Sequence, residues 1–151
     1  RSDMPMSVLF CDVATIYNYY ESEDGTEHWS RSVVKGVQWR HNRNEVSTSN
    51  GVQTENKVES ITIDFGRRYG NKPYLQPVEY NRLSDEEREN YWTLNAKSGK
   101  DIVVLGEATE EIGQDCRISA LREHYQYAVT VTAVSDNRNM PRLKHIKVVG
   151  K

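Results

Sequence analysis

The chain has 151 residues and a formal net charge of −2, from 20 Lys and Arg against 22 Asp and Glu. This length suits one domain. With 16 Val, 7 Ile and 9 Thr against 7 Leu and 6 Ala, the composition favours strands and argues against a helical bundle. No stretch approaches the roughly 20 apolar residues of a membrane span, and two cysteines, Cys11 and Cys116, are too few for a disulfide scaffold. We therefore expect a single domain over residues 1–151, in which residues 1–5 are a remnant of recombinant expression or disordered.

The first third of the chain predicts a hairpin. Residues 8–20 are rich in strand formers, Asp24-Gly25 marks a polar turn, and residues 29–39 form a second strand. Alternation along this second strand places one set of side chains on a common face: Trp29, Arg31, Val33, Lys35, Val37 and Trp39. Gly36 predicts a bulge or kink within it.

Residues 40–60 differ from the rest of the chain because only three of them, Val46, Val52 and Val58, are apolar. Asn50-Gly51 near the centre is a type I′ hairpin signal. Such a segment is either a long two-stranded arm that projects from the body or a segment that stays disordered until a partner orders it.

The remaining elements are shorter. Ser84 and Glu87 form a capping box that opens a short helix. The strongest strand is expected to place Val129, Val131 and Ala133 on one face and Val134 on the other. The predicted strands cover 61–65, 101–106, 125–134 and 143–149, and the predicted helices cover about 84–92 and 118–124. The fold class is mainly β: a small antiparallel β-barrel or sandwich with one short helix and the polar arm.

The sequence contains no recognisable catalytic or metal-binding pattern. Its four histidines lack zinc-ligand spacing, and it carries no phosphate-binding loop or nucleophile motif. We expect no enzyme activity, no cofactor and no metal.

Charge is unevenly distributed along the chain. Residues 111–151 carry 7 positive and 4 negative charges, or +3, whereas the preceding 110 residues sum to −5. Candidate interface residues lie in the acidic helix and in the basic C-terminal strand: Asp85, Glu86, Glu89, Arg138, Arg142, Lys144 and Lys147. Opposite charges permit head-to-tail pairing of copies in a ring. They equally fit a solvated strand edge, or nucleic-acid binding, although aromatic residues are not clustered beside them in the sequence.

The order of these elements resembles the head-closure, or stopper, proteins of tailed bacteriophages. The matching segments are Thr15-Ile16-Tyr17, residues 29–39, residues 101–106, residues 134–138 and residues 143–150. The chain is also similar to uncharacterised phage structural proteins of Gram-positive (Firmicutes) hosts. The length between Gly66 and Ser98 exceeds a minimal stopper barrel, which leaves a tail-side adaptor or another neck component open.

This resemblance implies a non-enzymatic virion protein, made in the bacterial cytoplasm, that forms a ring in the neck. Its partners would be further copies of itself, portal or adaptor and tail proteins, and the packaged DNA. By position, the arm would face the DNA channel, with candidate residues Arg40, Arg43, Val46, Asn50, Gly51, Val52 and Lys57. The alternatives are another virion protein, such as a minor capsid, tail-completion or tail-terminator protein, and a small nucleic-acid-binding β-barrel.

Overall fold

The computed structural model describes residues 12–47, 53–113 and 117–151, and side chains are described outside 41–57. Several predictions fall outside this part of the chain. They concern residues 1–5, the Asn50-Gly51 turn with Val52, and the two cysteines Cys11 and Cys116.

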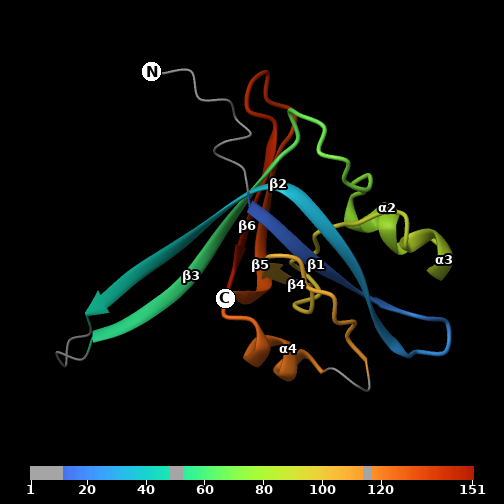
Figure 1. The fold of residues 1–151 in the computed structure, drawn as a ribbon, viewed down its shortest axis with the longest axis horizontal. Helices are drawn as coiled ribbons and strands as arrows, with labels where there is room; N and C mark the ends of the chain where they lie inside the picture. Colours follow the sequence, from blue (N-terminus) through green and yellow to red (C-terminus); the bar gives the residue numbers. More distant parts are fainter. Residues whose placement is uncertain (1–11, 48–52, 114–116) are drawn as a thin grey trace.

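The described residues form six strands, all paired antiparallel in one sheet. The strands are β1 (Asp12–Glu21), β2 (Glu27–Ser47), β3 (Gln53–Asp64), β4 (Ile102–Leu105), β5 (Ala128–Asn137) and β6 (His145–Gly150). Their order is β1-β2-β3-β6-β5-β4, and β4 pairs back onto β1, so the sheet closes into a barrel (Figure 1). The predicted mainly β class is confirmed.

The barrel core is built from the β-branched residues that dominate the composition. Ile16, Val34, Ile61 and Ile146 are fully buried, and Trp92 from the connection before β4 joins the same cluster. Burial of each such side chain stabilises the fold by roughly 1.5–3 kcal/mol. A sequence lean in Leu therefore still provides a core, with one cluster around these residues and a second around Tyr17, Ile102 and Leu121.

The prediction that alternate residues from Trp29 to Trp39 share one face is wrong, because of a bulge. Asp12 is paired with Val37 and Val13 with Lys35, so Gly36 is the extra residue, with φ at +79°. Ser32 and Val34 are buried before it, and Val37 and Trp39 after it. The bulge that the sequence predicts at Gly36 thus reverses the alternation.

A second irregularity shifts the alternation of β5. Val131 is paired with Gly150 and Ala133 with Val149, which leaves Thr132 outside the regular register. Ala133 is consequently exposed and Val134 packs against the core, the reverse of the predicted faces. The strand also begins at Ala128 rather than 125 and ends at Asn137 rather than 134.

Three short helices lie outside the barrel strands in the described chain: α2 (Pro77–Asn81), α3 (Asp85–Arg88) and α4 (Ile118–His124). α4 matches the prediction, α2 was not predicted, and α3 is shorter than the expected 84–92. α3 ends early because Trp92 must be extended to pair with Tyr74 and fill the core. Among the described residues, no helix is long and apolar enough to cross a membrane.

A buried carboxylate fastens the connection before β4 to β1. Asp101, 1 % exposed, accepts hydrogen bonds from the backbone N–H of Tyr19 (2.9 Å) and Asn95 (2.9 Å) and from the Asn18 side-chain amide (3.0 Å). The Asn18 amide also donates to the Thr93 carbonyl. Burial raises the pKa of Asp101 to about 6, against the lowering effect of these donors.

Candidate interaction surfaces

The most conspicuous feature outside the barrel is a two-stranded arm. β2 pairs with β3 from Val37↔Ile63 out to Ser47↔Gln53. β1 pairs with β2 only as far as Val37, and β6 pairs with β3 only as far as Glu59. Among the described residues, 42–47 and 53–58, called the arm from here on, therefore have only each other as partners in the sheet, and they extend away from the barrel (Figure 1). Of the two sequence interpretations, the structure contains the two-stranded arm.

The register of the arm places like charges opposite each other. Arg43 is paired with Lys57, and Glu45 with Glu55. Like charges at directly opposite positions destabilise an antiparallel pair. A two-stranded ribbon without a packed third strand is itself marginal in water. The arm is consequently far less stable than the barrel from which its strands emerge. Arg40, at its root, is exposed and lies opposite the buried Ser60.

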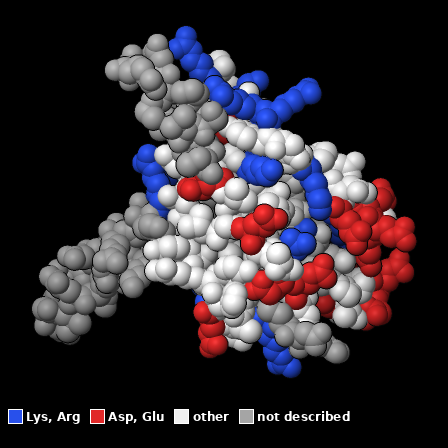
Figure 2. Space-filling view, viewed as in Figure 1, with Lys and Arg blue, Asp and Glu red and all other residues white. Residues whose placement is uncertain are grey.

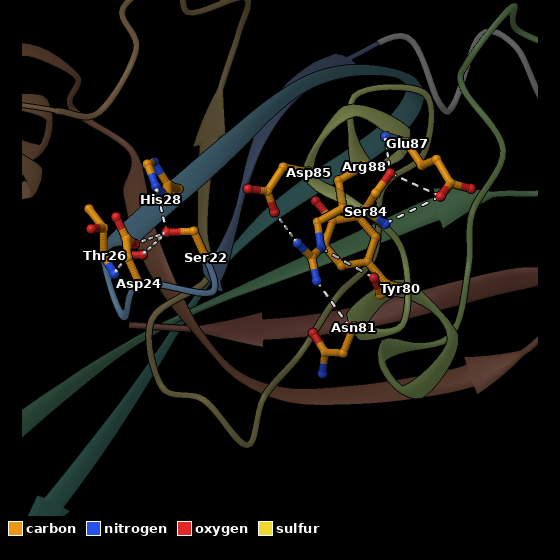
Figure 3. A network of polar contacts seen from close by, with 10 residues as sticks. All are labelled: Ser22, Asp24, Thr26, His28, Tyr80, Asn81, Ser84, Asp85, Glu87 and Arg88. Atoms are coloured by element: carbon orange, nitrogen blue, oxygen red, sulfur yellow. Dashed lines mark hydrogen bonds and ion pairs between the residues drawn. The ribbon is translucent and has the colours of Figure 1, made fainter.

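The turn between β1 and β2 holds an ionised carboxylate in a fixed position. Asp24 accepts hydrogen bonds from the Ser22 hydroxyl and from the Thr26 backbone N–H (3.0 Å), and His28 lies beside Ser22 (Figure 3). The Ser22 hydrogen bond, supported by Thr26, lowers the pKa of Asp24 to about 2. This carboxylate is charged at neutral pH.

Helix α3 is held beside that turn by Arg88, which is 7 % exposed. Its guanidinium donates to Asp85 (2.7 Å) and to the carbonyls of Tyr80 (3.3 Å) and Asn81 (3.0 Å) (Figure 3). It also lies 4.6 Å from the Tyr20 ring centroid. The helix begins with the predicted capping box, in which Ser84 Oγ accepts from the Glu87 N–H and the Glu87 carboxylate reaches back. Arg88 therefore joins α2, α3 and β1.

The turn and α3 together form an acidic surface around a cleft of about 750 Å³. Its carboxylates are Glu21, Glu23, Asp24, Asp85 and Glu86. Figure 2 shows this concentration of acidic side chains on the right, where Figure 1 places α3 and the β1–β2 turn. Of the predicted acidic candidates, Asp85 and Glu86 line the cleft, and Glu89 is exposed just beyond the helix. The contribution of the turn was missed, although four acidic residues lie within 21–27.

The structure separates Arg138 from the other basic candidates. Arg138 is paired with Asp136 (2.8 Å) and lies 4.8 Å from the Tyr74 ring centroid and 5.6 Å from that of Phe65. This pairing lowers the pKa of Asp136 to about 2. Arg138 therefore contributes to packing within this chain and is not a free surface cation. The other predicted cations are exposed and have no ion-pair partner within the described residues: Arg142, Lys144 and Lys147.

Further cations, which the sequence reasoning missed, lie beside them. The connection after β3 brings Arg67, Arg68 and Lys72 to one cleft of about 350 Å³. The Phe65 N–H donates to the Lys144 carbonyl (2.8 Å), which joins this connection to the start of β6. We call the combined group the basic end: Arg67, Arg68, Lys72, Arg142 and Lys144. Figure 2 shows basic side chains at the top of the molecule, where the β5–β6 turn lies in Figure 1.

Comparison with known proteins places the chain in a family without assigning it an activity. The profile of a family of unknown function, DUF6751, matches residues 11–151. The chain belongs to this family. No curated protein and no solved structure matched it. In this DUF6751 chain, the described residues contain no group of three or more His, Cys, Asp or Glu that could hold a metal ion.

Proposed function

We propose that the protein is a non-enzymatic structural component of a tailed-phage virion. In this proposal it is a head-closure or connector subunit that forms a ring in the neck between portal and tail. The observation that carries the proposal is the combination of a closed barrel with an arm whose two strands, among the described residues, pair only with each other. Such an arm is suited to a position where neighbouring subunits or DNA supply the missing contacts.

Two further features support assembly into a ring. The acidic surface presents five carboxylates on one side of the barrel (Figure 2), and a heterologous contact between such a surface and an unlike surface of the next copy generates a closed ring when the rotation closes. The arm, with its weak internal pairing, can change conformation at little cost, as a channel-facing element must when DNA passes.

The proposal is tested by the location of the protein in particles. Reconstruction of the virion should place the barrel between portal and tail, and deletion of its gene should leave particles that lose their DNA. A variant in which a short turn replaces residues 43–57 should keep the barrel, enter particles and still fail to retain DNA. Location in the capsid shell or at a tail end would favour another virion protein. DNA-filled tailed particles without this protein would contradict the head-closure function.

A further inference from the structure

The basic end concentrates five cations that the packing of the barrel does not require. Its five cations come from the connection after β3 and from the segment before β6. None has an ion-pair partner within the described residues, and all are exposed. Unpaired like charges close together repel, so their concentration costs stability unless an anion is bound.

The acidic residues nearest this end are already engaged. Asp64 is 6 % exposed and accepts hydrogen bonds from the Tyr69 hydroxyl (2.6 Å) and the Gly66 N–H (2.8 Å). Asp136 is paired with Arg138. Between Phe65 and Tyr74 there are three cations and no acid. Five exposed cations therefore outnumber the one nearby carboxylate, Asp64, that is not paired with an arginine, and this end keeps a net positive charge within the described chain.

Aromatic rings form the floor of the same cleft. Phe65 stacks on Trp92 at a centroid distance of 5.9 Å, and Tyr74 meets both of them edge-on, at 5.8 and 4.9 Å. Phe65, Tyr69 and Tyr74 line the cleft and are half-buried, so part of each remains accessible. Tyr69 is fixed because its ring packs on Gly36, where a β-carbon would lie 2.5 Å from it.

From this juxtaposition we infer that the basic end is a nucleic-acid binding surface, which contacts the phosphate backbone without reading sequence. Binding sites for single-stranded nucleic acids combine cations with partly exposed aromatic rings, whereas a docking site for an acidic protein surface requires only the positive charge. The basic end lies where β3 leaves the barrel, and the arm lies at the opposite end of the same strand. The inference therefore adds a second nucleic-acid contact, separate from the channel-facing role proposed for the arm.

Fluorescence anisotropy with a labelled single strand of about 20 nucleotides, longer than one such site, provides the test. Five phosphate contacts predict that affinity falls about 100-fold between about 50 and 200 mM salt. Arg67→Ala/Lys144→Ala should reduce the slope of log affinity against log salt by about 1.4. The matched control is Arg82→Ala/Lys97→Ala, which also removes two exposed cations but lies away from the basic end; it should leave the slope unchanged.

The inference is supported if the wild-type protein binds the strand, the control variant binds equally well and the test variant binds more weakly. Both variants must keep the wild-type unfolding temperature. If Arg67→Ala/Lys144→Ala unfolds, Lys72→Ala alone should lower the slope by about 0.7. Flat anisotropy at low salt, or equal weakening by test and control variants, would overturn it. So would a salt-dependent change in oligomeric state without oligonucleotide binding, because the basic end would then dock on the acidic surface of a second copy. None of these results depends on where the protein lies in a particle.

Discussion

The arm and the barrel differ although the same two strands build both. At Val37↔Ile63, β2 also pairs with β1 and β3 also pairs with β6, and both side chains are buried in the core. A few residues farther on, at Asn44↔Asn56, the two strands have only each other. Hydrogen-bond pairing continues without a break, so regular strand structure alone says little about stability. What differs is the presence of flanking strands, since tertiary packing supplies most of the free energy that holds a strand in place.

The largest expected effect compares one substitution in each region. Ile61→Ala removes a fully buried side chain and should lower the free energy of unfolding by about 2–5 kcal/mol. Val46→Ala in the arm should change it by less than about 0.5 kcal/mol, the usual range for sites without core packing. Urea unfolding followed by tryptophan fluorescence measures both. Similar losses for the two variants would show that the arm belongs to the cooperative unit of the barrel.

A second prediction uses the buried Asp101 of the barrel body. Because its folded pKa is raised to about 6 from 3.8, the folded state binds the proton more tightly than the unfolded chain. Its contribution to stability is fully present below about pH 4 and is lost as the pH rises through about 6. Wild-type protein should therefore lose about 2–3 kcal/mol between about pH 4 and 7 relative to Asp101→Asn. Parallel stability curves for the two proteins would contradict this.

The bulge that joins the barrel to its basic end gives a third test. Gly36→Ala places a β-carbon at positive φ and against the Tyr69 ring, whereas Gly25→Ala meets the same φ penalty with nothing within 4 Å. A strained φ costs about 1–3 kcal/mol, so both variants should be destabilised. Gly36→Ala should lose more, by the cost of displacing Tyr69. Equal losses in thermal unfolding would mean that the Tyr69 packing contributes nothing.

The smallest expected effect comes from a charge substitution in the arm. Glu55→Lys converts a like-charge pair with Glu45 into an opposite-charge pair and should stabilise the arm by about 0.2–1 kcal/mol. Arm amides should then exchange with solvent about 1.4- to 5-fold more slowly. Glu45→Lys/Glu55→Lys restores a like-charge pair and should return the rate to the wild-type value. Slowing of the same size in the double variant would show that charge pairing is not responsible.

Much of the fold could be predicted from the sequence because local signals were strong. The capping box at Ser84, the bulge at Gly36 and the two-stranded arm, one of the two alternatives for residues 40–60, each rest on neighbouring residues. The faces of two strands were wrong because a bulge reverses the alternation, and its effect on register depends on the partner strand. α2 was missed because its five residues carry little periodicity.

The interaction surfaces could be predicted only in part. Asp85 and Glu86 were found because they are contiguous in sequence. The turn acids that join them, and the cations Arg67 and Arg68 that join Lys144, come from distant segments and meet only when the barrel closes. Arg138 was grouped with the exposed cations because only the charges of the segment were counted. Its pairing with Asp136 two residues away was a signal that charge counting passed over.

The central claim, a stable barrel that carries a marginal arm, is tested most directly by native-state amide hydrogen exchange of the wild-type protein. The account predicts that amides in β1 and β4, such as those of Ile16 and Val103, exchange only by global unfolding. Amides of residues 42–47 and 53–58 should exchange through local opening, orders of magnitude faster. Equal protection of arm and barrel in the isolated protein would contradict the account.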